Sequence, residues 1–207
     1  MKVKSLSILL ALSLLPVFCA QAQNDEGYAA ERGAAITFAL HHLSDRDALA
    51  RQRAAEVMAK FSAVEHQRLV EGYRLQEKNE RVRLALDWAL YRMGKTDALY
   101  GVVRGLRSDD KRAQAVGYLL QLDGPRPLYL FLDRADRKTL VGLFEVMATI
   151  GDADTVELVK PFITSDDSEV SDSAAFAMRE ITTRLSQTPQ GTPTRQREVQ
   201  TNNKVGP

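Results

Sequence analysis

A spacing of 30 residues recurs through the middle of this 207-residue chain. Shifting the sequence by that distance brings together residues that are identical or of similar size: Arg51 with Arg81, Arg53 with Arg83, Ala55 with Ala85, Met58 with Trp88, Ala59 with Ala89 and Phe61 with Tyr91. Glycines that we expect to end helices recur as well, at Gly94, Gly124 and Gly151, which are 30 and then 27 residues apart. A period of this length is typical of arrays of small units, each of which needs its neighbours to fold.

Each unit has the pattern of two helices. In the first segment of the clearest unit, Val82, Leu86, Ala89 and Met93 fall on one helical face. Gly94 can adopt the left-handed conformation that ends a helix. A second helix then buries one stripe of apolar residues, namely Leu99, Val102, Val103 and Leu106.

Three further pairs follow the same pattern. Their predicted segments are Arg51–Phe61 with Glu65–Glu77, Lys111–Leu122 with Leu128–Ala135, and Arg137–Ile150 with Asp154–Ile163. Pro161 falls inside the last of these segments and should kink or shorten it. We expect Tyr28–Leu43 to cap one end of the array and Val170–Leu185 the other.

A pair of helices about a dozen residues long cannot bury both of its apolar faces, so the units must stack side by side. The sequence therefore predicts an all-α fold, with residues 23–185 as one repeat domain. Residues 186–207 are almost devoid of apolar side chains and contain three prolines, which predicts a disordered tail.

Residues 1–22 have the pattern of a cleaved signal peptide. Lys2 and Lys4 precede an apolar run of 13 residues, Leu6–Phe18, and Ala20-Gln21-Ala22 forms a small-residue cleavage motif. The run is short for a membrane span. We therefore predict a periplasmic or secreted protein with no transmembrane segment in the mature chain.

Cys19, the single cysteine, raises the alternative of a lipid-anchored protein. Lipidated signals carry small residues before the cysteine, and here that place is taken by the bulky Phe18, so the sequence favours cleavage over anchoring. Because Cys19 lies inside the predicted signal, the exported chain would have neither a disulfide nor a thiolate nucleophile.

The charge balance disfavours a nucleic-acid partner. The formal net charge is +1, and loss of Lys2 and Lys4 with the signal changes it to −1. No strong field of one sign remains to attract a polyanion.

The pattern resembles the HEAT repeat superfamily, and in particular the short HEAT-like repeats named after phycobilisome lyases. The residues that carry the likeness are Glu80–Arg83, Ala85, Ala89, Met93-Gly94 and Asp97–Leu99, with a second match at Asp152–Val156 and Ser165–Val170. The likeness covers Arg51–Ile181. It implies a right-handed α-α superhelix, a HEAT-like α-solenoid of about four helix pairs plus capping helices, that binds a protein partner along its concave face.

Two units depart from the repeat pattern. The unit between Asp109 and Asp136 is irregular around Pro125 and Pro127, and the first unit has Val64 where the turn glycine is expected.

Enzyme chemistry finds little support in the sequence. One HEAT-like family holds two irons with His-Glu pairs, but this chain has no His-Glu dipeptide, and the adjacent His41 and His42 point about 100° apart on a helix. A Gly-x-Ser-x-Gly elbow and a phosphate-binding glycine loop are also missing. Bilin lyase activity fits poorly with export, and we predict neither a catalytic site nor a cofactor or metal.

The second helices supply the candidate binding residues. Tyr100, Arg104 and Arg107 lie opposite the buried stripe of their helix, and the adjacent units contribute Arg74 on one side and Tyr129 and Asp133 on the other. Tyrosine and arginine are enriched at protein-binding hot spots. An ordinary solvated helix face is the competing interpretation for each residue. Trp88 aligns with Met58, which favours core packing over a ligand site.

The predicted function is thus a non-catalytic scaffold or adaptor in the bacterial envelope. Two alternatives remain. One is a structural envelope-assembly protein that bridges components through its array or tail, and the other, which has less support, is a metal-dependent HEAT-like enzyme.

Overall fold

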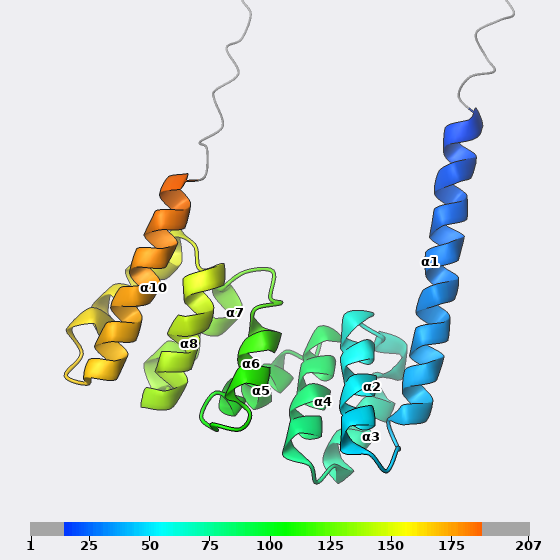
Figure 1. Cartoon of the computed structure of the whole chain (residues 1–207), viewed down its shortest axis with the longest axis horizontal. Coiled ribbons are helices and arrows are strands. Elements are labelled where there is room, and N and C mark those ends of the chain that lie inside the picture. Colours follow the sequence, from blue (N-terminus) through cyan, green and yellow to red (C-terminus); the bar gives the residue numbers. More distant parts are fainter. Residues whose placement is uncertain (1–14, 188–207) are drawn as a thin grey trace, which may run out of the picture. The chain divides into compact units, whose positions relative to one another are not determined.

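The computed structural model describes residues 15–187, and every regular element within this range is a helix. The predicted all-α class is confirmed. The chain divides into two compact units, residues 1–121 and residues 122–207 (Figure 1). The boundary falls inside the segment predicted as one repeat domain, within the helix pair that Pro125 and Pro127 make irregular.

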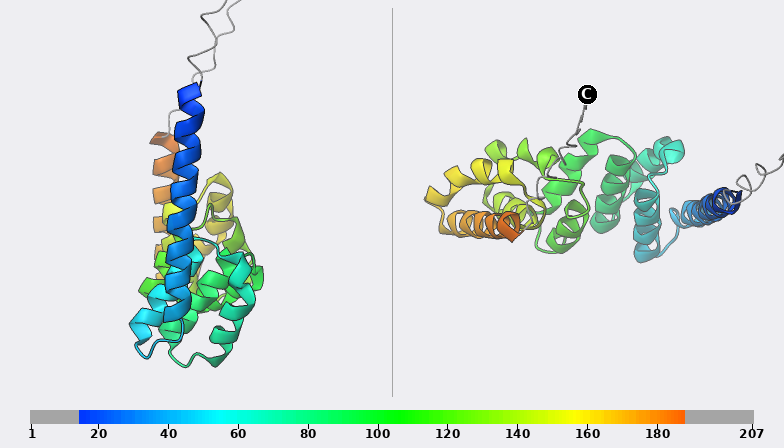
Figure 2. Two further views of the ribbon diagram at one scale, coloured as in Figure 1. Left: turned by 90° about the vertical axis from the view of Figure 1, so that its right-hand side faces the viewer. Right: turned by 90° about the horizontal axis from the view of Figure 1, so that it is seen from above.

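The first unit contains six α-helices and two short 3₁₀ helices in its described part. Their bounds are α1 Leu15–His42, α2 Ala48–Lys60, η1 Val64–His66, α3 Gln67–Gln76, α4 Glu80–Arg92, η2 Thr96–Ala98, α5 Leu99–Gly105 and α6 Arg112–Leu119. The predicted helix pairs therefore form, as α2 with α3 and α4 with α5. The cap is longer than predicted, because α1 begins at Leu15 and its N-terminal part extends past the other helices of the unit (Figure 2).

The first helices of successive pairs carry buried alanines at the sequence spacing of 30 residues. Helix α2 packs against α4, and α1 packs against the other side of α2. Ala55, Ala85 and Ala115, one on each of α2, α4 and α6, are completely buried. A residue with only a methyl side chain lets neighbouring helices approach closely.

Helix α4 is buried on more than the one face that its apolar period predicts. Every residue from Leu84 to Leu90 is buried. The reason is its position, since α4 contacts α2, α3 and α5. Along Leu84–Leu90 the helix therefore has no solvent face to keep polar.

The predicted core role of Trp88 is confirmed. Its side chain is 2% exposed. Its ring lies parallel to that of Tyr118 on α6, with the ring centroids 5.7 Å apart. The Tyr118 hydroxyl in turn donates a hydrogen bond of 2.6 Å to Glu56 on α2. Burial, followed by the bond to Glu56, raises the pKa of Tyr118.

The turns that end α2 and α4 share one geometry. Gly94 has the predicted left-handed conformation, with a φ of 98°. The amide of the next residue, Lys95, donates a hydrogen bond of 3.0 Å to the carbonyl of Leu90. In the turn after α2, the left-handed residue is Ser62, with a φ of 45°, and not Val64. The helix ends two residues earlier than the sequence alignment implies, so the turn position falls on a serine.

The arginines that begin the first helices join the ends of each pair. Arg51 binds both oxygens of the Glu77 carboxylate, at 2.7 and 3.0 Å, and also the carbonyl of Asp45. Arg81, near the start of α4, donates to the carbonyl of Asp110 at 2.8 Å. These contacts tie the start of a first helix to the connection that follows its second helix.

The second unit is built around α8 and α10. Its elements are α7 Arg126–Tyr129, η3 Leu132–Arg134, α8 Arg137–Ile150, α9 Ala153–Val159, η4 Lys160–Thr164 and α10 Ser168–Gln187. Helix α10 packs against α8 and also contacts α9 and η4. The carboxylates of Asp136 and Asp152 accept backbone amides at the starts of α8 and α9.

Two predictions for the second unit have different outcomes. Pro161 shortens its helix as predicted, because the α-helix ends at Val159 and a 3₁₀ helix continues. The predicted single helix Leu128–Ala135 is wrong, since the segment is broken into the short α7 and η3. Gly151 ends α8 in an extended conformation with a φ of −63°.

Some sequence predictions fall at the edges of the described range. Residues 1–14 of the predicted signal peptide and residues 188–207 of the predicted tail lie outside the described residues. Ser186 and Gln187, the first two residues of that tail, still belong to α10. No helix within residues 15–187 combines the length and the apolar character that a membrane crossing requires.

We predict that Ala89→Glu unfolds the first unit. Ala89 is completely buried on α4, so the substitution places an unpaired carboxylate in the core, at a cost of several kcal/mol. Urea denaturation followed by circular dichroism measures the loss. Ala113→Glu, at an exposed position of α6, is the matched control and should leave the midpoint nearly unchanged. A variant at Ala89 that melts like the wild type would contradict its placement between helices.

We also predict that the Arg51–Glu77 ion pair makes the free energy of unfolding decrease at acidic pH. The hydrogen bond from Arg51 lowers the pKa of Glu77 below its ordinary value of 4.5. Because the unfolded chain then binds more protons, this stabilisation is complete above about pH 5 and is lost as pH falls through the lowered pKa. Between about pH 5 and pH 3, Glu77→Gln should therefore lose less unfolding free energy than the wild type.

Denaturant melts at both pH values measure the difference between Glu77→Gln and the wild type. Glu31→Gln, at an exposed position of α1, is the control and should follow the wild type. Equal pH dependence in the Glu77 variant and the wild type would contradict the prediction.

Candidate functional site

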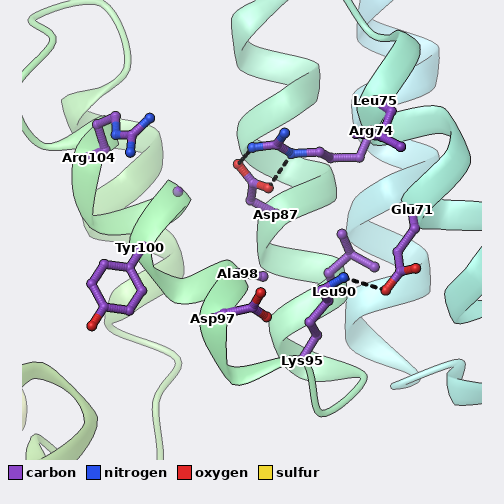
Figure 3. A pocket seen from close by; sticks show the side chains of 11 residues that line it. Glu71, Arg74, Leu75, Asp87, Leu90, Lys95, Asp97, Ala98, Tyr100 and Arg104 are labelled. Carbon is purple, nitrogen blue, oxygen red and sulfur yellow. Dashed lines mark hydrogen bonds and ion pairs between the residues drawn. The ribbon is translucent and has the colours of Figure 1, made fainter.

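A cavity of about 320 Å³ lies among α3, α4, η2 and α5 of the first unit (Figure 3). We call it the α3/α5 cavity. Its lining residues are Glu71, Arg74, Leu75, Asp87, Leu90, Lys95, Asp97, Ala98, Tyr100, Gly101 and Arg104. Three of the six residues predicted from the sequence to bind a partner, Arg74, Tyr100 and Arg104, are among them.

The apolar stripe of α5 sets the direction of the side chains that line the cavity. Leu99, Val102 and Val103 are at most 3% exposed. This burial turns the remaining face of the helix outward, so Tyr100 is 55% exposed, and Arg104 is exposed as well. The predicted orientation of α5 is therefore correct.

A buried carboxylate forms the inner wall of the cavity. Asp87 is 5% exposed in the middle of α4. The Arg74 guanidinium of α3 donates two hydrogen bonds to this carboxylate, from Nε to Oδ1 at 2.7 Å and from Nη2 to Oδ2 at 3.4 Å (Figure 3). The hydrogen bond to Asp87 raises the pKa of Arg74. A carboxylate in such a position is tolerated because it is paired and hydrogen-bonded.

Gly101 on α5 makes room for this carboxylate. A Cβ atom at Gly101 would lie 2.2 Å from Oδ2 and 2.6 Å from Cγ of Asp87. Any larger residue would displace the Asp87 side chain from its place beside Arg74. The glycine therefore couples α5 to the ion pair between α3 and α4.

A second ion pair closes the other end of the cavity. Lys95 Nζ lies 2.6 Å from Oε1 of Glu71. This hydrogen bond lowers the pKa of Glu71 and raises that of Lys95. Asp97 and Arg104 also line the cavity, and neither forms an ion pair with another residue of the described chain. The cavity thus combines two satisfied pairs with one unmatched acid and one unmatched base.

Apolar side chains are exposed beside these charges. Leu75, at the end of α3, is 77% exposed, and Tyr100 is more than half exposed. Aromatic residues and arginine are enriched at protein interfaces, and Tyr100 and Arg104 provide both here. The arrangement offers hydrogen-bond donors and apolar contact area for a ligand that lies across α3 and α5.

The other three predicted residues do not line this cavity. Arg107 is exposed at the end of α5. Tyr129 and Asp133 belong to the second unit, on α7 and η3. The Tyr129 hydroxyl is 2.8 Å from Oδ1 of Asp152 and 2.7 Å from Oγ1 of Thr155. It thus joins α7 to the start of α9, an internal role that its sequence position did not suggest.

Sequence reasoning missed Asp87 and Gly101, which shape the cavity. A signal for Asp87 exists, because it is the one charged residue in the otherwise apolar run Leu84–Leu90. Gly101 has no such signal, because glycine is common in loops and helix ends, and its role depends on contact with Asp87.

The histidines and acids form no recognisable metal centre in the described chain. His42 stacks on Phe38, with ring centroids 4.0 Å apart, and its Nδ1 lies 2.8 Å from the Phe38 carbonyl oxygen. Among the side chains that the structure describes, those of residues 27–187, no three of His, Cys, Asp or Glu lie close enough together to hold an ion.

Comparison with known proteins gives no family assignment. No model of a known protein family matches the sequence, and no curated protein is similar enough to match it.

We predict that Gly101→Ala destabilises the first unit by about 1–3 kcal/mol, because the new methyl group overlaps the Asp87 carboxylate. Gly117→Ala is the matched control. It lies in α6 at an exposed position where a Cβ would meet nothing within 4 Å. This control should gain about 0.5–1 kcal/mol, since alanine favours helix over glycine. Urea denaturation measures both, and equal stabilisation of the two variants would contradict the packing of Gly101 on Asp87.

Proposed function

We propose that this chain is a non-catalytic protein-binding scaffold with a HEAT-like α-solenoid architecture, exported to the bacterial envelope. The 30-residue repeat and the buried alanines shared by α2, α4 and α6 support the solenoid. The pattern of Lys2, Lys4 and the apolar run up to Phe18 supports export. The partner is a protein.

The observation that carries the binding role is the α3/α5 cavity. Its lining combines exposed Leu75 and Tyr100 with the unmatched Arg104. These residues stand on second helices, where the resemblance to HEAT repeats places the partner. A stiff framework lies behind them, because Asp87 and Arg74 fix α3 against α4 and Gly101 packs α5 against the same carboxylate. Little ordering is then needed when a partner binds, which favours affinity.

The test is a comparative pull-down from bacterial envelope extract, followed by mass spectrometry and titration of the purified partner. Tyr100→Ala combined with Arg104→Ala should weaken binding of the partner at least about tenfold, the effect expected when two hot-spot residues are removed. Arg53→Ala, at an exposed position of α2, removes an arginine elsewhere and should bind like the wild type.

The double variant should keep the helical circular dichroism of the wild type, because both substituted side chains are exposed. Unchanged affinity for the partner in that folded variant would show that the α3/α5 cavity is not the binding surface.

A further inference from the structure

A second cavity of the first unit, of about 370 Å³, lies among the first helices α2, α4 and α6. We call it the α2/α6 pocket. Its lining residues are Glu56, Trp88, Gln114, Gly117, Tyr118 and Gln121. It shares no lining residue with the α3/α5 cavity, so the proposed partner-binding surface does not account for it.

The pocket has an aromatic wall and an open side. The rings of Trp88 and Tyr118 are parallel, and their side chains are only 2% and 6% exposed. At Gly117 the space is free, because a Cβ atom there would meet nothing within 4 Å. The open side leaves room for the aliphatic part of a ligand.

The donors beside Glu56 already point to acceptors of the protein itself. The Tyr118 hydroxyl donates to Glu56 Oε1 at 2.6 Å, and the raised pKa of this phenol means that it keeps its proton at neutral pH. The Nε2 group of Gln114 donates to the Tyr118 hydroxyl at 2.8 Å and to the Arg81 carbonyl at 3.0 Å, which uses both of its hydrogens. Neither Tyr118 nor Gln114 therefore has a donor left for a ligand.

Two side-chain oxygens of the pocket, in contrast, lack a donor. The hydrogen bonds that Glu56 accepts, from Gln52 and Tyr118, both end on Oε1, so Oε2 receives none from a described residue. Gln114 Oε1 is the one buried side-chain nitrogen or oxygen among the described residues that has no hydrogen-bond partner. Its orientation is fixed, because the Arg81 carbonyl only accepts and must face Nε2. An orphaned buried acceptor in the same pocket as a carboxylate points to a ligand that brings donors.

Glu56 also forms no ion pair with any residue that the structure describes. Lys60, one turn further along α2, lies over the Phe61 ring, with Nζ 5.3 Å from the ring centroid. Arg92, at the end of α4, donates instead to the carbonyl of Gln121 at 3.3 Å. The charge of Glu56 is therefore available to a cation from outside the chain.

We propose that the α2/α6 pocket binds an alkylammonium or guanidinium group, with the Glu56 carboxylate as its counter-ion. Such a group carries only donors, which matches a pocket whose unsatisfied polar atoms are acceptors. Glu56 Oε2 supplies the charge-assisted hydrogen bond, and the buried Gln114 oxygen adds negative potential without touching the ligand. The group belongs either to a basic side chain of a protein or to a free diamine. This site stands apart from the proposed role of the α3/α5 cavity.

The test uses the full chain and follows the fluorescence of Trp88, the single tryptophan, which lines the pocket. The cationic probes are butylammonium and butylguanidinium, and butanol is the neutral probe of similar length. All are titrated at constant ionic strength into the wild type, Glu56→Gln and the control Glu31→Gln, which removes an exposed carboxylate of α1. Glu56→Gln keeps a side-chain oxygen that accepts from Tyr118, and a urea melt checks that the variant is folded.

On the wild type and on Glu31→Gln, both cations should change the fluorescence saturably, and butanol should bind at least about tenfold more weakly. On Glu56→Gln, the affinity for both cations should fall at least about tenfold, because the counter-ion is gone. The affinity of the wild type for the cations should also decrease as salt is raised. The variant with Tyr100→Ala and Arg104→Ala should bind the probes like the wild type, which separates this site from the α3/α5 cavity.

Two further probes distinguish the sources of the cation. Tighter binding of N-acetyl-lysine methylamide than of putrescine would indicate a protein side chain, and the reverse order would indicate a free diamine. Butanol that binds as well as butylammonium to the wild type would overturn the proposal without any variant. It would also be overturned if neither cation gave a saturable change, or if folded Glu56→Gln bound both cations with the affinity of the wild type.

Discussion

The close contact between successive first helices is the constraint on which the first unit depends. Ala55, Ala85 and Ala115, one on each of α2, α4 and α6, are completely buried. Larger residues of the same helices, such as Met58 and Trp88, are buried with them. A core without voids is built from a mixture of small and large side chains, so each first helix needs its neighbours to complete the packing.

Crowding around α4 also determines the character of the candidate site. Since the middle of α4 is enclosed by α2, α3 and α5, a polar side chain there must find its partner inside the protein. Asp87 finds Arg74, and Gly101 gives it room. The second helices are less enclosed, because α3 and α5 bury only one stripe each. Their free faces keep Leu75, Tyr100 and Arg104 in contact with solvent.

The sequence predicted the helices and their pairing because helical period and glycine turns act over a few residues. It placed Pro161, Gly94 and the buried stripe of α5 correctly for that reason. It could not predict the break between α7 and η3, which interrupts an apolar run without an internal proline. Nor could it show that Tyr129 binds Asp152 or that Asp87 faces Gly101, because these contacts join segments whose distance depends on the packed structure.

One contact in the first unit departs from the usual logic of a stacked array. In such arrays each layer touches only the layer before and the layer after, and stability is a sum of such adjacent terms. The hydrogen bond from Tyr118 to Glu56 instead passes over the layer between them, joining residues 62 positions apart in sequence. Peeling α6 away under tension must therefore also break its link with α2, and the three layers should yield in a single step where independent layers would yield in succession.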